Sequence, residues 1–285
     1  MYKVLVTGVN GQLGSEIQSV SQDYPFEFIF KDSKSLDITD QEKVFDFLKI
    51  NNVNAIINCA AYTAVDRAET ETENADAVNH LAVKHLAESS KDLNIILVHV
   101  STDYVFNGES FQPYIEDSIC DPRSVYGATK RAGEEAMISL HVPNSIIIRT
   151  SWVYSAFGKN FVKTMRKMGS EKSEISVVAD QIGTPTYARD LAICILDILP
   201  KISCNQTTIY HFSDEGVCSW YDFAIAIMEL SGYSCKVNPI PSSQYPTPAK
   251  RPFYSVLSKS KIKADFGVSI PHWRESLQRC IENLD

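Results

Sequence analysis

The sequence predicts an α/β fold, with a doubly wound parallel sheet and a smaller C-terminal lobe. Two observations support this prediction. Short apolar, β-branched runs alternate with stretches of helical periodicity through the first 150 residues. The first of these runs, Val4–Val6, ends in a turn with glycines at positions 8, 11 and 14. Beyond residue 150 the alternation loosens, and six of the 12 prolines fall between Pro239 and Pro271, which indicates a loop-rich region.

The elements can be placed in order along the chain. In the first part we expect strands at 4–6, 26–30, 54–58, 94–100 and 145–149, and helices from residue 13 and at 41–48, 69–91 and 124–140. In the later part we expect helices at 161–168, 189–199, 220–230 and 273–283, and strands at 175–179 and 208–212. The strand at 94–100 is almost wholly apolar, as expected of a strand that helices cover on both faces.

Composition and charge limit the class of protein. The chain has 285 residues, of which 44% are hydrophobic and 22% charged, so it can bury a substantial core. A net charge of -8 argues against nucleic acid or an anionic membrane as the main partner. No apolar run approaches the about 18 residues of a membrane-spanning helix. The seven cysteines show no disulfide or zinc spacing, and we expect a cytoplasmic protein.

The glycine turn after the first strand predicts a dinucleotide site. Gly8 allows a tight turn, Gly11 lets the backbone approach a pyrophosphate, and Gly14 lets the following helix close onto the strand. The N–H groups at the start of that helix would face the phosphates. We therefore expect a dinucleotide-binding Rossmann domain at residues 1–150. Residues 151–285 would form mainly a substrate-binding lobe, with some segments returning to the Rossmann sheet.

A tyrosine and a lysine four residues apart form the second motif. Tyr126 and Lys130 share one face of the predicted helix that follows the fourth strand, where ligands bind in such sheets. With 13 tyrosines, about one such pair is expected by chance, so a surface helix is the alternative. Lowering the pKa of a phenol from about 10 by about three units takes about 4 kcal/mol. An ammonium about 4 Å away supplies that much, so we expect Lys130 to lower the pKa of Tyr126.

The third motif is the segment Ser101–Phe106 at the carboxyl end of the fourth strand. Its hydroxyl groups can point into the same cleft as Tyr126. Thr102 would then donate a hydrogen bond to a substrate carbonyl while Tyr126 protonates it. Serine, threonine and aspartate are also common in turns, so this segment alone would indicate no more than a turn.

Together these motifs resemble the extended short-chain dehydrogenase/reductase family, over almost the whole chain. The glycine and Tyr/Lys motifs occur throughout the sugar-nucleotide enzymes of that family, whereas other segments are typical of a narrower branch. The segments that carry the resemblance are Thr7–Gly14, Asn58–Asp66, Ser101–Phe106, Tyr126–Lys130, Arg149–Tyr154, Asp180–Thr186 and Arg251–Leu257.

The resemblance implies a set of site residues. The catalytic set would be Thr102, Tyr126 and Lys130. With the glycine turn, the cofactor-binding set would be Gly8, Gly11, Gln12, Leu13, Gly14, Lys31, Asp37, Ile38, Ala61, Tyr62, Thr63, Val100, Tyr126 and Lys130. The substrate-binding set would be Thr102, Asp103, Tyr104, Trp152, Asn160 and Arg251. Three of these have structural alternatives: a core position for Trp152, a helix cap for Asn160 and a surface charge for Arg251.

Cofactor choice stays open between NADPH and NADH. Lys31 and Asp32 stand just past the second strand; a basic residue there favours the extra phosphate of NADP, and an acidic one favours NAD. The resemblance also suggests a homodimer, because some members are described as magnesium-linked dimers that use glutamates. This chain has Arg189-Asp190 in the corresponding region, so we predict no metal site.

The function implied by the resemblance is reduction of the keto group of a deoxysugar nucleotide by NAD(P)H. A sugar-nucleotide epimerase or a related deoxysugar reductase would keep the same motifs. A third alternative is a non-catalytic binding partner that resembles the regulatory β subunit of methionine adenosyltransferase. Lasting consumption of the cofactor would separate a reductase from an epimerase, which regenerates its cofactor at each turnover. Co-purification with a synthetase, and no turnover on any keto sugar, would favour the binding partner.

Overall fold

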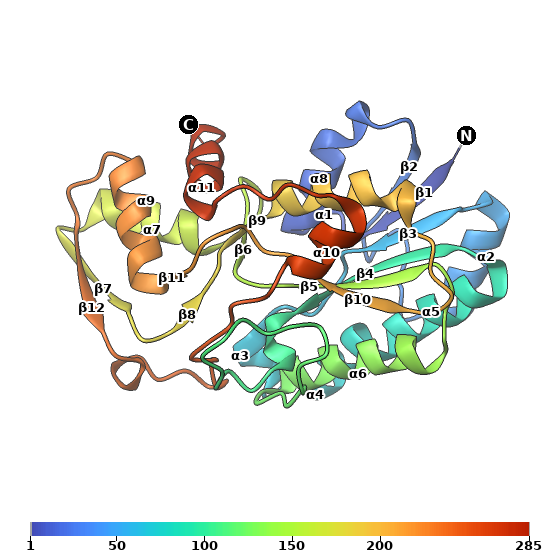
Figure 1. Ribbon diagram of the computed structural model, residues 1–285, viewed down its shortest axis with the longest axis horizontal. Coiled ribbons are helices and arrows are strands. Elements are labelled where there is room, and N and C mark those ends of the chain that lie inside the picture. Colours follow the sequence, from blue (N-terminus) through green and yellow to red (C-terminus); the bar gives the residue numbers. More distant parts are fainter. Residues whose placement is uncertain (1, 285) are drawn as a thin grey trace.

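The computed structural model describes residues 2–284, and a parallel sheet forms its centre (Figure 1). The strands of this sheet are Lys3–Thr7 (β1), Glu27–Lys31 (β2), Ala55–Asn58 (β3), Ile96–Thr102 (β4), Ser145–Thr150 (β5) and Thr208–His211 (β10). They lie in the order β10-β5-β4-β3-β1-β2, and every neighbouring pair is parallel. Since the strand order reverses between β1 and β3, a crevice forms there at the carboxyl ends of the strands.

Helices cover both faces of the sheet (Figure 1). On one face lie α1 (Gln12–Val20) and α8 (Ala188–Ile198); on the other lie α2 (Gln41–Asn51), α5 (Ala82–Leu93) and α6 (Val125–Ser139). Side chains alternate between the two cores, since Val4 and Val6 pack beside α1 and α8 whereas Leu5 packs beside α2 and α5. The predicted doubly wound α/β fold is confirmed.

The later part of the chain contributes to both the sheet and a smaller lobe. The lobe contains the helices α7 (Phe161–Glu171), α9 (Trp220–Leu230) and α11 (Trp273–Glu282), and the paired strands β7 (Glu174–Val178) and β12 (Lys236–Ile240). Short two-residue strands connect it to the sheet: β6 (Val153–Tyr154), β8 (Ile182–Gly183), β9 (Thr186–Tyr187) and β11 (Cys218–Ser219). Between these elements the chain returns to the sheet as α8, β10 and α10 (Ser260–Phe266).

The helix predicted at 69–91 is the main correction to the predicted elements. The chain forms a short helix α3 (Val65–Ala68), then α4 (Thr72–Asp76), a π-helical turn at Ala77–Leu81, and α5. In the π turn, Asn79 bonds both backbone polar groups of Tyr62. Helical periodicity did not predict the π turn. The extra residue in that turn is tied to the contact between Asn79 and Tyr62, which only the folded chain brings together. The strand β12 was also missed, since Pro239 lowers its strand propensity.

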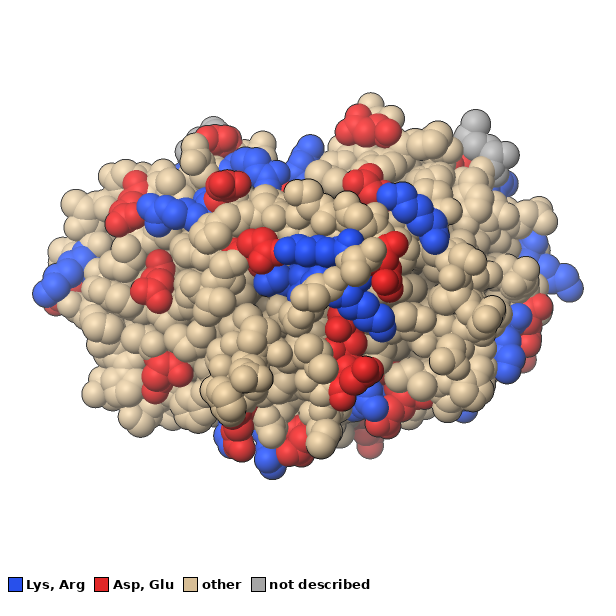
Figure 2. Space-filling view, in the orientation of Figure 1, with Lys and Arg blue, Asp and Glu red and all other residues tan. Residues whose placement is uncertain are grey.

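Charged side chains are distributed over the surface. On the face shown in Figure 2, basic and acidic groups lie interspersed. The ion pairs that Lys259 and Lys263 make with Glu215 are examples of this pairing. Within residues 2–284, no helix has both the length and the apolar character needed to cross a bilayer.

Candidate active site

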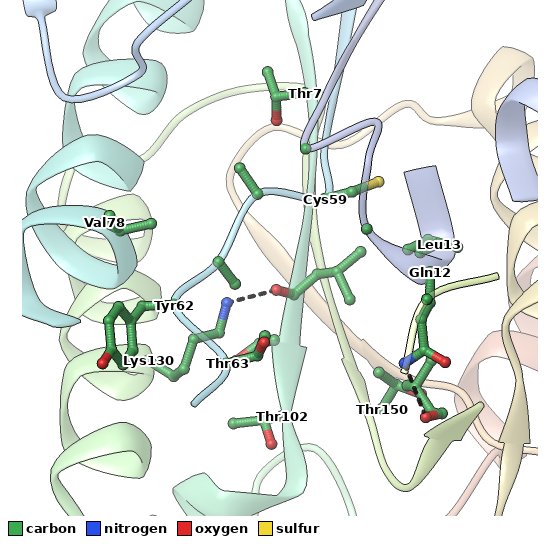
Figure 3. A pocket seen from close by; sticks show the side chains of 18 of the residues that line it. Thr7, Gln12, Leu13, Cys59, Tyr62, Thr63, Val78, Thr102, Lys130 and Thr150 are labelled. Carbon is green, nitrogen blue, oxygen red and sulfur yellow. Dashed lines mark hydrogen bonds between the residues drawn. The ribbon is translucent and has the colours of Figure 1, made fainter. Parts of the chain in front are cut away.

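A cavity of about 850 Å³ runs along the carboxyl ends of the central strands, from the glycine turn to the smaller lobe. Figure 3 shows part of it, with Gln12 and Leu13 from α1 on one side and Lys130 from α6 on the other. The turns after β1, β2, β3 and β4 all contribute to its lining. Its volume and its lining, which extends from the glycine turn to Trp220, leave room for a cofactor and a second ligand.

The glycine turn forms a cradle that side chains would fill. Gly8 has a φ of +67°, and a Cβ on Gly14 would lie 2.5 Å from the Gly8 carbonyl oxygen. Helix α1 therefore begins tightly against β1, with Gly11 as its N-cap and no side chain capping it. The first N–H groups of α1 have no partner within the helix and face the cavity lined by Gly11, Gln12 and Leu13. This cradle fits a pyrophosphate.

At the end of β2, the side chains of the neighbouring residues Lys31 and Asp32 lie in different places. Asp32 lines the cavity and accepts hydrogen bonds from Asn10 Nδ2 at 3.1 Å and from Ser35 Oγ at 2.7 Å. Lys31 does not line it: its ammonium lies 5.1 Å from the centre of the Phe47 ring. The structure thus places the acidic rather than the basic residue at the adenosine end. Asp37 and Ile38 line the same end.

The wall opposite α1 comes from the turn after β3. Ala61, Tyr62 and Thr63 line the cavity there, next to Val100 of β4. The Tyr62 hydroxyl donates to Glu71 Oε2 at 2.7 Å, and its backbone is held by Asn79. Gly14 and Asn160 do not line the cavity. Gly14 instead lets α1 pack closely against the turn that follows β1.

The predicted catalytic residues meet where the cavity passes β4. Lys130 is 1% exposed, and its Nζ donates to the Val100 carbonyl oxygen at 2.7 Å (Figure 3). Burial lowers the pKa of Lys130 to about 8. Tyr126 lies four residues earlier on α6 and lines the same cavity, as does Thr102. The lysine and the phenol therefore reach the same cavity from positions one turn apart on α6.

The prediction that Lys130 lowers the pKa of Tyr126 is wrong for this structure. Desolvation by the surrounding protein raises the pKa of the phenol instead, and the neighbouring Asp103 and Tyr104 raise it further. The Nζ of Lys130 donates its hydrogen bond to the Val100 carbonyl oxygen, so it does not offset the effect of desolvation on the pKa of the phenol. The phenol is consequently protonated at neutral pH, which is the state of a proton donor.

Thr102 and Asp103 form a hydrogen-bonded pair next to the phenol. Thr102 Oγ1 donates to Asp103 Oδ1 at 3.0 Å and accepts from the Tyr104 N–H at 3.2 Å. Asp103 is 3% exposed, and burial raises the pKa of its carboxyl to about 7. The Tyr104 and Tyr126 rings pack edge to face, with their centroids 5.4 Å apart.

Two tryptophans form the wall at the far end of the cavity. Trp152 stacks on Trp220, with ring centroids 3.6 Å apart and planes 9° apart, and both residues line the cavity. Trp152 has a φ of +49°, a strained conformation for a bulky residue that is typical of ligand sites. Trp220 was not predicted. The Ser219–Asp222 capping box marks the start of α9 in the sequence, but nothing there indicates that its first residue faces the cavity.

Arg251 lies beside the main cavity rather than in it. Its Nη2 pairs with Asp66 at 2.6 Å, and its Nη1 donates to the Tyr104 hydroxyl at 3.1 Å. With Lys250 and Arg123 it lines a small adjoining pocket that shares Tyr104 with the main cavity. Asp66 was missed as a site residue, because its partner is 185 positions away in the sequence.

Asn160 serves as a helix cap, one of its two expected roles. Its Oδ1 accepts from the Lys163 N–H at 3.1 Å at the start of α7. Its Nδ2 donates to Gln12 Oε1 at 2.9 Å, so the cap also links the lobe to the glycine turn. Among residues 2–284, no three His, Cys, Asp or Glu side chains are grouped in a way that could hold a metal ion.

Comparisons with known proteins agree with this geometry. A sequence model of the family described as RmlD substrate binding domain matches residues 2–285. The chain belongs to this family. The spore coat polysaccharide biosynthesis protein SpsK of Bacillus subtilis is 43% identical over 99% of this chain and 98% of its own. The dTDP-4-dehydrorhamnose reductase of Aggregatibacter actinomycetemcomitans is 42% identical over 98% of each chain.

A solved structure extends the likeness to the whole fold. The dTDP-4-dehydrorhamnose reductase of Bacillus anthracis, in complex with NADP, has a TM-score of 0.94 and 38% identity, and the match covers 99% of both chains. The resemblance inferred from the motifs is confirmed and narrowed. Several homologues of this chain are named dTDP-4-dehydrorhamnose reductases, and one of these was solved in complex with NADP.

Proposed function

We propose that this protein reduces the 4-keto group of dTDP-4-dehydro-L-rhamnose to give dTDP-L-rhamnose, with NADPH or NADH as cofactor. One observation carries the proposal: a protonated phenol, Tyr126, lies between a glycine cradle that fits a pyrophosphate and a wall of stacked tryptophans. The names of full-length relatives at 38–42% identity support the same reaction and substrate.

The chain's own residues account for the proton in this reaction. The bound nicotinamide supplies a hydride to the keto carbon. Tyr126 donates its phenolic proton to the oxygen, since its raised pKa keeps it protonated until an alkoxide develops. Thr102 orients the carbonyl through its hydroxyl, whose oxygen accepts from the Tyr104 N–H. On substrate binding the hydroxyl turns its single proton from Asp103 to the carbonyl oxygen. Lys130 would hold the nicotinamide ribose through hydrogen bonds from its Nζ, which the amine and the ammonium can both donate.

We assign the remaining roles by position along the cavity. Gly8, Gly11, Gln12 and Leu13 hold the pyrophosphate. Asp37 and Ile38 flank the adenine, and Ala61, Tyr62, Thr63 and Val100 line the nicotinamide half. For the substrate, Trp152 and Trp220 provide a flat apolar surface for the planar keto sugar. Arg251 offers a guanidinium to the nucleotide diphosphate.

Replacing the phenol tests the proposal directly. Tyr126→Phe should lower kcat about 10²- to 10⁴-fold, the usual contribution of a general acid. The dissociation constant of NADPH, measured by fluorescence, should stay within a few-fold of wild type. Turnover is followed as lasting NAD(P)H oxidation with the keto sugar nucleotide. Full activity in Tyr126→Phe would remove the proposed acid, and wild-type protein that consumes no cofactor would favour an epimerase or a binding partner.

Two expectations about the cellular form stay predictions. A homodimer is testable by light scattering of the purified protein, and a cytoplasmic location by fractionation of cells that express it.

A further inference from the structure

A chain of buried polar side chains runs beneath the cleft and ends at Lys130. Thr7 Oγ1 donates to Asn58 Oδ1 at 2.6 Å, and Asn58 Nδ2 lies 3.0 Å from His99 Nδ1. His99 Nε2 in turn lies 3.2 Å from Lys130 Nζ. The four residues stand on β1, β3, β4 and α6, and none is more than 1% exposed. Such a row of polar groups through a parallel sheet is costly unless its hydrogen bonds are matched.

The direction of these hydrogen bonds is fixed at Asn58. Its Oδ1 accepts from the backbone N–H of Ala60 at 3.3 Å as well as from Thr7. A backbone N–H can only donate, so the oxygen of the amide must face Ala60 and the NH₂ group must face His99. Asn58 therefore donates to His99 Nδ1, and that nitrogen carries no proton.

The tautomer of His99 follows from this. Burial and the neighbouring Lys130 hold the pKa of His99 well below its usual range, so the ring is neutral. A neutral ring with a bare Nδ1 carries its proton on Nε2. This N–H points at Lys130 Nζ. A neutral amine can accept it, whereas an ammonium has no lone pair and would place N–H against N–H.

We propose that His99 is a positioning residue for the reduction, and that the Thr7–Asn58–His99 chain locks its Nε2–H tautomer so that it favours the neutral amine of Lys130 over the ammonium. The catalytic consequence rests on the proposed function. Once Tyr126 has given up its proton it must regain one, and a lysine that exchanges its proton near neutral pH is suited to that task.

The other groups around Lys130 do not impose this state. Glu134, one turn further along α6, favours the ammonium, but it is already paired with Arg149 at 2.7 Å and with Arg131. Cys59 faces Lys130 as a neutral thiol, because burial raises its pKa to about 12. The Val100 carbonyl accepts from either form of the lysine. Burial itself disfavours the ammonium and lowers the pKa of Lys130 to about 8. Among the hydrogen-bonding contacts of Nζ, the one with His99 is the one that only the neutral amine can accept.

Asn58→Asp reverses the arrangement with a change of one atom. A carboxylate keeps an oxygen for Ala60 and Thr7 but accepts from His99, so the proton moves to Nδ1 and Nε2 accepts from the ammonium. The pKa of Lys130 should rise by about one unit or more, a tenfold change in proton affinity. Asn54→Asp is the matched control. It adds the same charge at the amino end of β3, where the side-chain oxygen accepts from the Lys3 N–H as an aspartate oxygen also can.

Nuclear magnetic resonance of the ligand-free protein provides the readout. The ¹⁵N shifts of His99 should report the Nε2–H tautomer in wild type and in Asn54→Asp, and the Nδ1–H tautomer in Asn58→Asp. The side-chain shifts of Lys130 against pH should give its pKa in each. In the pH profile of kcat, the limb assigned to Lys130 should move up in Asn58→Asp alone.

The proposal is overturned if wild-type His99 carries its proton on Nδ1 at neutral pH, a measurement that needs no variant to fold. It is also overturned if the tautomer of Asn58→Asp changes while the pKa of Lys130 does not. Both results are independent of substrate. Absence of turnover on the keto sugar in wild type would instead count against the proposed function and leave the tautomer result standing.

Discussion

The two ends of the cleft are built in different ways. At the cofactor end, backbone from consecutive turns lines the cavity, with segments 7–13, 32–39 and 59–63 following β1, β2 and β3 directly. At the substrate end, the surface consists of side-chain pairs between distant segments. Trp152 stacks on Trp220, and Arg251 pairs with Asp66.

This difference predicts how each end responds to change. The cofactor end depends on the path of the backbone. It should therefore tolerate changes of exposed side chains but not an added Cβ in the glycine turn between β1 and α1. The substrate end depends on individual pairs, so single truncations there should weaken substrate binding without moving the cofactor. Four variants test this contrast, from the largest expected effect to the smallest.

Gly14→Val should have the largest effect and act on the cofactor. Its Cβ would lie 2.5 Å from the Gly8 carbonyl oxygen and 2.6 Å from Val9 Cα, so α1 must shift away from the turn. Overpacking of this kind costs about 1–3 kcal/mol, which corresponds to about 5- to 150-fold in the dissociation constant of NADPH if it falls on the bound state. Calorimetric titration measures it. Unchanged affinity would show that the turn does not form the pyrophosphate cradle.

Arg251→Met should act on the substrate alone. It removes the guanidinium that contacts Tyr104 and pairs with Asp66, while keeping much of the apolar stem. A hydrogen bond to a charged group contributes about 1.5–3 kcal/mol, so KM for the sugar nucleotide should rise about 10- to 100-fold. Arg274→Met, which removes an exposed guanidinium paired with Glu229 outside both pockets, is the control. An increase in the NADPH dissociation constant instead would contradict the separation of the two ends.

Trp220→Ala should give a smaller change at the same end. It removes one member of the stacked pair, and such a pair contributes about 0.5–1.5 kcal/mol beyond the burial of its area. We expect KM for the sugar nucleotide to rise about 3- to 10-fold while kcat falls little. Trp220→Phe should restore most of the loss. A fall in kcat with KM unchanged would mean that the wall acts on the reacting atoms rather than on binding.

Asn160→Ala should have the smallest effect on the reaction. It tests whether Asn160 only caps α7 or also contributes to substrate binding. Loss of the cap on α7 should lower the free energy of unfolding by about 1 kcal/mol. Asn160→Asp keeps the acceptor for the Lys163 N–H and loses the donor to Gln12. If Asn160 is only a cap, Asp should restore stability and both variants should keep KM. A raised KM in both would assign it to the substrate.

Prediction from sequence succeeded where the signal is local. The strand, glycine turn and helix at the amino end are encoded by adjacent residues, and the structure has β1 and α1 there. The four-residue spacing placed Tyr126 and Lys130 on one face of α6, and both line the cavity. Such periodicities are properties of a single element and need no knowledge of its neighbours.

Prediction failed or stayed open where the answer depends on neighbouring elements. Lys31 and Asp32 are adjacent, yet Phe47 on α2 draws the lysine away while Asn10 and Ser35 hold the aspartate at the cavity. The pKa of Tyr126 was predicted to fall because only Lys130 was visible from the sequence. Desolvation, which depends on every surrounding element, outweighs it.

The sequence alone therefore determined the α/β class, the glycine turn between β1 and α1, and the helix face that carries the phenol and the lysine. Tertiary structure decided which residues meet across the cleft. Trp152 meets Trp220, Arg251 meets Asp66, and His99 reaches Lys130 through the order and register of the strands. Side-chain chemistry and spacing are written along the chain, but proximity between distant segments, and the desolvation it brings, exist only after the chain has folded.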